Sequence, residues 1–234
     1  MRQVSLRPIF STKLGVLYKG DCLEILPHIQ SETVTTVFAD PPYNLGKYYG
    51  TEVNDNLPEL EYLNWCKCWT AEGIRTLIPG GAFFLYNLPK WNIILADYLL
   101  KLGMSFRHWI AVSMKLGLPI PGRLYPSHYS LLYFTKGKPK TFKKIRVPIE
   151  KCRHCGKETK DYGGHRDVMN ANGVNLTGVW NDIPPIYRFL NDVLSNRNAF
   201  ASMRSISSVT VATSIRFVLN KRIKLRCRKK TIGR

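Results

Sequence analysis

Short apolar runs alternate with amphipathic segments along the first 135 residues of the chain. Residues 59–77 and 92–102 repeat apolar side chains at helical spacing, and residues 23–29 do so for a turn and a half. This alternation predicts a three-layer α/β domain, in which helices cover a sheet. In the segment 59–77, the side chains expected to face the core are Leu60, Leu63, Trp69 and Ile74. Strands are predicted at residues 16–18, 33–39, 82–86, 109–112 and 130–134.

Turn residues and local composition divide the chain into three parts. Pro79-Gly80-Gly81 is expected to end the first long helix, and Gly103 the second. Residues 14–135 form the predicted α/β core. Residues 136–187 are basic and turn-rich, which predicts an insert beside the sheet. Residues 188–234 form a basic tail of a different composition.

Basic residues outnumber acidic residues by 35 to 16, which gives a formal net charge of +19. This excess favours a polyanionic partner, because lysine and arginine replace counterions on phosphate. The same composition would also fit a soluble protein whose surface is basic but binds no such partner. Residues 188–234 hold 12 basic residues and one acidic residue, so the tail carries more than half of the excess. No apolar run is long enough to span a bilayer and no signal-like segment opens the chain. We therefore expect a cytoplasmic protein without a membrane partner.

The strand predicted at residues 33–39 ends in Asp40-Pro41-Pro42-Tyr43. Ligands of open α/β sheets bind at the carboxyl ends of the strands. The prolines pre-set the loop by fixing φ, although Asp and Pro are also common in simple turns.

Asp40-Pro41-Pro42-Tyr43 resembles the catalytic motif of the amino-group DNA methyltransferases, which methylate the N6 of adenine or the N4 of cytosine. Such an exocyclic amine is a poor nucleophile, because its lone pair is delocalised into the ring. The resemblance implies that the Asp40 carboxylate and the Pro41 carbonyl accept its two hydrogens and make it more reactive, and that Tyr43 stacks on the base. Lys19-Gly20-Asp21-Cys22 resembles the turn that opens many β-class members of this family. The resemblance implies a Rossmann-like sheet that uses S-adenosylmethionine and methylates a specific sequence of double-stranded DNA, as in restriction–modification systems. The target base would be flipped out of the duplex. Asp rather than Ser at the first motif position favours adenine N6 over cytosine N4.

The resemblance implies that residues 14–135 are the catalytic core and that the basic insert, residues 136–187, is the target-recognition region. It also implies roles for individual side chains on both sides of the motif. Asp21 is equally suited to cap a helix, and a lone histidine such as His128 is more often structural than functional. The expected catalytic residues are Asp40, Pro41, Pro42 and Tyr43; the cofactor-binding residues are Asp21, Cys22 and Asp40; the base-binding residues are Tyr43, Asn44, His128 and Tyr129.

Six cysteines are scattered through the chain, and without an export signal reduced thiols are expected. Cys152 and Cys155 have the spacing of half a zinc site, and His165 could be a third ligand. A closed structural zinc site needs four ligands, commonly two such pairs, and the chain has no second Cys-x-x-Cys. We therefore expect no metal, and a pair of thiols in a tight turn of the insert.

The resemblance stops near residue 187, before the glycine loop that holds the methionine end of the cofactor in β-class enzymes. Residues 188–234 contain one glycine, Gly233. The tail could be a nucleic-acid-binding appendage or an out-of-register translation after a frameshift, and we favour the second. The sheet is then incomplete at the C-terminus, and a homodimer or a complementing polypeptide is possible.

Two other functions stay open at this point. The chain could be an inactive remnant that binds DNA through its lysines and lacks the donor-binding glycine loop. It could also methylate RNA or a protein amide, although related enzymes of those kinds commonly carry Asn where this chain has Asp40.

Overall fold

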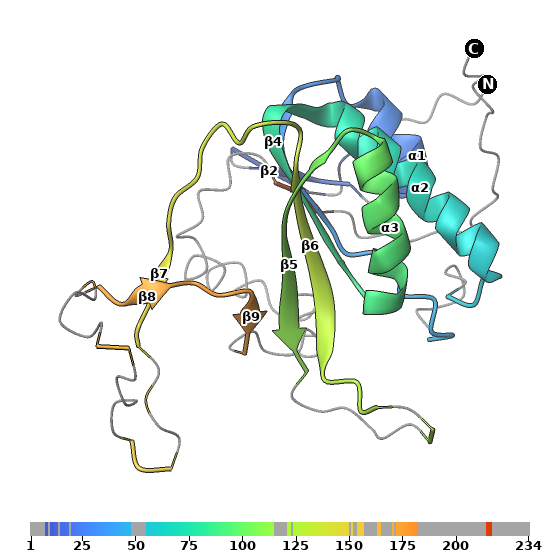
Figure 1. The fold of residues 1–234 in the computed structure, drawn as a ribbon. Coiled ribbons are helices and arrows are strands. Elements are labelled where there is room, and N and C mark those ends of the chain that lie inside the picture. The colour runs from blue at the N-terminus through green and yellow to red at the C-terminus, as the bar shows by residue number, and fades with distance from the viewer. Residues whose placement is uncertain are drawn as a thin grey trace, which may run out of the picture.

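The computed structural model describes residues 8, 10–13, 15–18, 20–47, 55–114, 121–122, 124–149, 151, 154–156, 163–164, 170, 172–181 and 214–216. These residues form an α/β fold around one mixed sheet of six strands (Figure 1). Two short two-stranded sheets accompany it, β1 (Phe10–Thr12) with β2 (Gly15–Leu17) and β7 (Arg146–Val147) with β8 (Val174–Asn175). The predicted α/β class is confirmed.

The main sheet has the strand order β10-β3-β4-β6-β5-β9. Strand β6 is antiparallel to both of its neighbours, β4 and β5, whereas the pairs β3–β4, β5–β9 and β10–β3 are parallel. The amino end of β6 therefore lies at the same edge of the sheet as the carboxyl ends of β3, β4 and β5. The bounds are β3 Val34–Ala39, β4 Leu77–Asn87, β5 Ser105–Ser113, β6 His128–Thr135, β9 Val179–Trp180 and β10 Ser214–Arg216.

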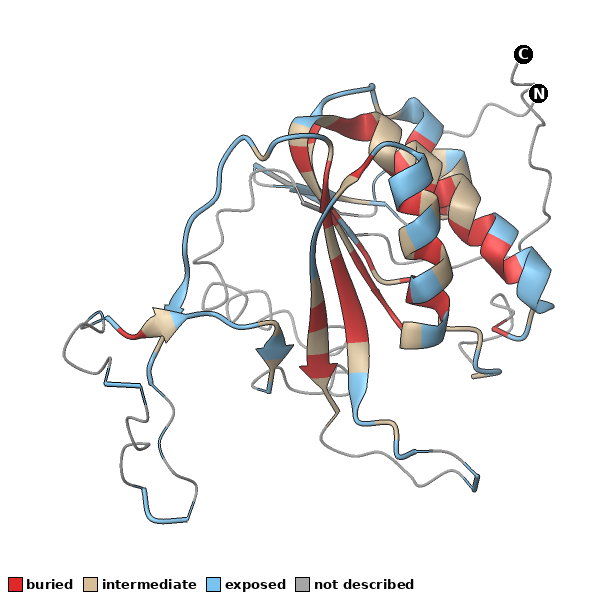
Figure 2. Ribbon diagram, viewed as in Figure 1, coloured by how far each residue is buried: buried red, intermediate tan, exposed pale blue. Residues whose placement is uncertain are grey.

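The described helices pack together on one face of the sheet (Figure 1). They are α1 (Cys22–Ile25), the 3-10 helix η1 (Leu26–His28), α2 (Glu59–Thr76) and α3 (Pro89–Lys101). Figure 2 shows buried residues along the central strands and on the helix sides that meet them. No helix in the described part of the chain is long and apolar enough to cross a bilayer. The core between the helices and the sheet includes Val37, Phe83, Leu85, Leu132, Phe134, Leu95 and Leu99.

Helix α2 buries a broad stripe of large side chains, including Tyr62, Trp65, Cys66 and Trp69. These positions recur at helical spacing, so they share one side of the helix. Leu60 is 70% exposed, and the expectation that it faces the core was wrong. At 100° per residue, Leu60 lies on nearly the opposite side of the helix from the stripe.

Strand β4 begins earlier than its sequence predicts. Helix α2 ends at Thr76 and β4 starts at Leu77, so Pro79-Gly80-Gly81 lies within the strand instead of ending the helix. The register between β3 and β4 shifts there, from Val34 opposite Leu77 to Thr36 opposite Ala82. Gly80 has φ +80°, a conformation that costs glycine little, so the three residues form an irregularity that the strand absorbs.

Residues beyond 135 contribute to the main sheet at both of its edges. Strand β9 pairs with β5, and β10 pairs with β3. The β7–β8 ribbon lies apart from the sheet (Figure 1). The segment 136–187 therefore contains both a separate ribbon and a strand of the sheet, while the division at residues 135 and 187 stays a prediction.

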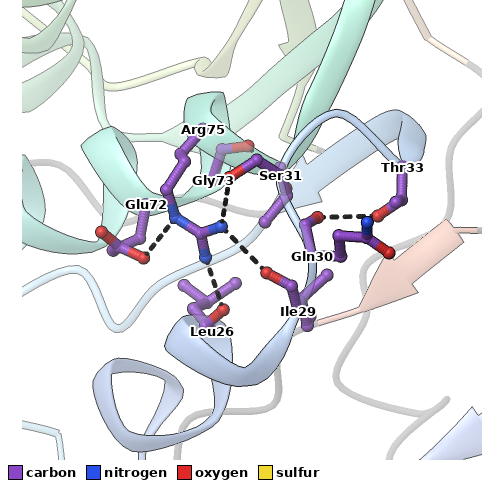
Figure 3. A network of polar contacts seen from close by, with 9 residues as sticks. Leu26, Ile29, Gln30, Ser31, Thr33, Glu72, Gly73 and Arg75 are labelled. Atoms are coloured by element: carbon purple, nitrogen blue, oxygen red, sulfur yellow. Dashed lines mark hydrogen bonds and ion pairs between the residues drawn. The ribbon is translucent and has the colours of Figure 1, made fainter.

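Arg75, in the last turn of α2, joins this helix to η1 (Figure 3). Its Nη2 donates to the Leu26 carbonyl at 2.8 Å, and its Nη1 donates at 2.9 Å to the Ile29 carbonyl and to Ser31 Oγ. Its Nε pairs with Glu72 at 2.9 Å. The Leu26 carbonyl also accepts the Ile29 amide at 2.9 Å, so the guanidinium adds a second donor there and supplies a donor to the Ile29 carbonyl just after the helix.

Candidate active site

The motif residues and two aromatic side chains meet at one edge of the sheet. Asp40 to Tyr43 follow β3, Tyr86 lies near the carboxyl end of β4, and Tyr129 lies at the amino end of β6. They converge because β6 runs antiparallel to β4, with Tyr86 opposite Leu131. This is the edge at which open α/β sheets bind ligands.

Tyr43 contacts both the Asp40 carboxylate and the rings of Tyr86 and Tyr129. Its hydroxyl donates to Asp40 Oδ1 at 2.9 Å. Its ring centroid is 5.6 Å from that of Tyr129 and 6.2 Å from that of Tyr86. Burial and the nearby charge of Asp40 raise the pKa of the Tyr43 phenol far above its usual value. The hydroxyl therefore stays protonated and remains a donor to Asp40 at any pH near neutrality.

His128 and Tyr129 do not reach the same place. Tyr129 packs against Tyr86, with centroids 5.4 Å apart, on the sheet face that also carries Ile110 and Val112. Neighbouring residues of a strand point to opposite faces, so His128 faces the other side, where it is exposed. The structure therefore brings Tyr129 to Tyr43 and separates His128 from it.

Asn44 is engaged in holding its own loop. Its φ of +56° marks a left-handed turn. Its Nδ2 donates to the Leu57 carbonyl at 2.8 Å, and its Oδ1 accepts from the Leu57 amide at 2.7 Å. The side chain is thereby committed to the backbone at Leu57, and its role toward a base stays a prediction.

Three side chains that were not among the predicted site residues also hold this loop. Asp55, Tyr62 and Trp91 bind backbone groups between Pro42 and Lys47. They lie 12 to about 50 residues away from the motif along the chain. Of the three, only Asp55 could have been suspected of this role from the sequence, since buried carboxylates often bind loop amides.

Asp21 and Cys22 lie at the start of α1. Asp21 caps this helix, because its Oδ1 accepts the Leu23 amide at 2.9 Å. Cys22 is 3% exposed and belongs to the core beneath the helices. Burial, with a smaller effect of Asp21, raises the pKa of the Cys22 thiol well above its usual value, so this thiol is an unreactive core residue. Their role at the cofactor's adenosine end stays a prediction.

The thiols behave differently from one another. Cys22, Cys66 and Cys155 are free, as expected, whereas Cys68 is disulfide-bonded, so the expectation of reduced thiols was wrong for Cys68. Among the described residues, no group of three His, Cys, Asp or Glu side chains is placed to hold a metal ion. Cys152 and His165 lie outside the described residues.

Known proteins share both the motif region and most of the remaining chain. Residues 34–221 match the model of a DNA methylase family, the N6/N4 methyltransferases. The match runs past residue 187, where we expected the resemblance to stop. The type II methyltransferase M.BamHI of Bacillus amyloliquefaciens is 53% identical over 182 residues, which are 77% of this chain and 43% of that protein.

A second relative is M.HpaI of Haemophilus parainfluenzae, also a type II methyltransferase. It is 32% identical over 166 residues, 69% of this chain and 48% of the relative. The chain thus spans less than half the length of either protein. The solved PvuII DNA methyltransferase (cytosine-N4-specific) is similar with a TM-score of 0.48 and 22% identity, over 58% of this chain and 54% of that one. Since the family model covers most of its length, the chain belongs to the N6/N4 DNA methylase family.

Proposed function

We propose that this chain forms the catalytic pocket of a site-specific DNA methyltransferase that acts on the N6 amine of adenine. The observation that carries the proposal is the Asp40 carboxylate, held at the ligand-binding edge of the sheet beside Tyr43, Tyr86 and Tyr129. The motif's Asp in the first position supports adenine over cytosine. Double-stranded DNA is the substrate, and its target base is flipped to reach the pocket.

The residues of the pocket fit both a base and a positively charged methyl donor. A carboxylate and tyrosine rings suit a cation, and S-adenosylmethionine, when bound, supplies a methyl group on a positively charged sulfur. The Asp40 carboxylate and the Pro41 carbonyl accept the two hydrogens of the target amine and localise its lone pair on nitrogen. The tyrosine rings offer faces on which the base stacks. Asp21 lies at the start of α1, where we place the adenosine end of the donor.

The product nucleoside tests this proposal directly. Purified protein is incubated with duplex DNA and methyl-labelled donor, and the DNA is digested and analysed by mass spectrometry. The expected product is N6-methyldeoxyadenosine. If the product is N4-methyldeoxycytidine, the chain is a DNA methyltransferase but the choice of adenine is wrong. Label in RNA but not in DNA would overturn the proposal that DNA is the substrate.

The two functional groups of Tyr43 are expected to contribute unequally. Tyr43→Ala removes the ring and should lower kcat/KM about 10- to 100-fold, because base stacking contributes roughly 1–3 kcal/mol. For Tyr43→Phe, kcat/KM should stay within about fivefold of the wild-type value. The substrate amine displaces the Tyr43 hydroxyl from Asp40, so this hydroxyl no longer contacts the carboxylate in the transition state and cannot stabilise that state. Steady-state kinetics with one DNA substrate separates the two, and equal losses would contradict the stacking role.

A second function, DNA binding without methyl transfer, is favoured by one observation. After residue 187 the sequence contains one glycine, Gly233, and no glycine-rich stretch of the kind that lets backbone approach a bound cofactor closely. Calorimetric titration with S-adenosylmethionine distinguishes the two functions. Heat that disappears in Asp40→Ala supports the methyltransferase, whereas no heat at millimolar donor together with retained DNA binding supports the second function.

A further inference from the structure

The loop after β3 is bound at two consecutive carbonyls by side chains from the helix layer. The Tyr62 hydroxyl, from α2, donates to the Pro42 carbonyl at 2.7 Å. Trp91 Nε1, from α3, donates to the Tyr43 carbonyl at 2.8 Å. Both side chains are almost fully buried, and their ring centroids are 4.8 Å apart. The two donors therefore form one rigid support beneath the loop.

The Tyr62 hydroxyl is itself oriented by Asn87, at the carboxyl end of β4. Asn87 Nδ2 donates to the Tyr62 oxygen at 3.0 Å, and Asn87 Oδ1 accepts the Leu88 amide at 2.7 Å. Because Asn87 presents its N–H groups to Tyr62, the tyrosine proton is directed to Pro42. Burial raises the pKa of the Tyr62 phenol far above its usual value, which keeps this proton in place.

The following residues are fixed from the other side by Asp55, which is 4% exposed. Its carboxylate accepts the backbone amides of Asn44 at 2.7 Å, Lys47 at 3.0 Å and Leu45 at 3.1 Å. The loop is thus held at both ends of the segment from Pro42 to Lys47. A buried carboxylate with three amide donors is a stable anchor, since hydrogen bonds to a charged acceptor are stronger than those between neutral groups and they satisfy the buried carboxylate.

The Pro41 carbonyl differs from the two carbonyls that follow it in its hydrogen bonding. The carbonyls of Pro42 and Tyr43 are occupied by Tyr62 and Trp91, whereas among the described residues no hydrogen-bond donor binds the Pro41 carbonyl. Proline rings fix φ at positions 41 and 42, so ψ is the main remaining freedom of this segment. A hydrogen bond to the Pro42 carbonyl restrains ψ of Pro42 and therefore the direction of the whole segment.

We infer that Tyr62 is a positioning residue for methyl transfer, which holds the Pro41 carbonyl and the Asp40 carboxylate at the spacing that the target amine requires. This inference rests on the proposed function. Tyr62 does not touch the substrate; it acts through the Pro42 carbonyl, with Asn87 orienting its hydroxyl. Small displacements of a catalytic group are costly, because a misplacement of about 1 Å can lower a rate roughly 100-fold.

Tyr62→Phe tests the inference, because it keeps the buried ring and removes only the hydroxyl. We expect kcat for methyl transfer to fall about 10- to 100-fold while KM for DNA changes less than about threefold. Trp91→Phe, which removes the donor to the Tyr43 carbonyl, is the second variant, and we expect the same split. Val34→Ala is the matched control. Val34 is buried at the opposite end of β3, so this substitution should lower Tm without affecting the loop.

A second measurement does not depend on activity. Hydrogen exchange of the peptide covering residues 40–47 should accelerate about tenfold in Tyr62→Phe and stay unchanged in Val34→Ala, because the loop amides open more often when their support is lost. Accelerated exchange with a wild type that transfers no methyl group would retain the loop-holding role and reject the proposed function. An active Tyr62→Phe with the kcat and loop exchange of the control would overturn the inference.

Discussion

Replacing Asp40 by alanine is expected to lower the rate of methyl transfer to DNA about 100- to 1,000-fold, the usual cost of removing one preorganised group that stabilises a transition state. The variant removes the partner of the Tyr43 hydroxyl and, in the proposed function, an acceptor for the target amine. Incorporation of labelled methyl groups into duplex DNA at saturating donor measures the loss.

Asp97→Ala provides the matched control for this experiment. Asp97 is an exposed carboxylate on α3, paired with Lys101, and it lies away from the sheet edge that carries the motif. We expect this variant to keep the wild-type rate within about twofold, because exposed ion pairs contribute little. Equal rates for Asp40→Ala and Asp97→Ala would place the chemistry outside this pocket.

Replacing Arg75 by alanine is expected to destabilise the fold by about 2–4 kcal/mol and to lower Tm by roughly 5–15 °C. The change removes hydrogen bonds to the Leu26 and Ile29 carbonyls and the pairing with Glu72 (Figure 3). This range already allows for the solvent that reaches a side chain that is 31% exposed. Thermal unfolding followed by circular dichroism gives the value.

Two further variants serve as controls for Arg75→Ala. Lys101→Ala deletes another basic residue from the last turn of a helix, but its side chain is 71% exposed, so we expect a change below about 0.5 kcal/mol. Arg75→Lys keeps the charge and loses the planar fork that reaches several acceptors at once, so its Tm should lie between those of the wild type and Arg75→Ala. A Tm of Arg75→Ala equal to that of Lys101→Ala would show that the network adds no stability.

Hydrophobic spacing was enough to predict most of the described fold. Strand β3, helices α2 and α3, and strands β5 and β6 lie close to their predicted places. The start of β4 was missed because Pro79-Gly80-Gly81 normally ends regular structure, and here the strand absorbs it as an irregularity. The pairing of β9 and β10 with distant strands could not be predicted, because two- and three-residue strands have no periodic pattern.

The candidate site was predictable only where neighbours in the sequence are neighbours in space. The motif from Asp40 to Tyr43 could be read as one unit. The alternation of side chains along a strand already implies that His128 and Tyr129 face opposite ways, and this signal was overlooked. Tyr62 and Trp91 gave no signal, since a buried aromatic residue on a helix looks like an ordinary core residue until its polar atom is seen to meet a loop carbonyl.

The hydrogen bond from Tyr43 to Asp40 has a consequence for which molecules the pocket admits. In the proposed function, a base that displaces the hydroxyl must return a donor to Asp40 Oδ1, because the loss of this hydrogen bond costs about 1–3 kcal/mol. A base with an exocyclic amine meets this condition. A base with an oxygen in that position, such as thymine, would instead bring a second acceptor against the carboxylate and be rejected. The proposed site would thus discriminate against such bases before a methyl donor binds or any reaction begins.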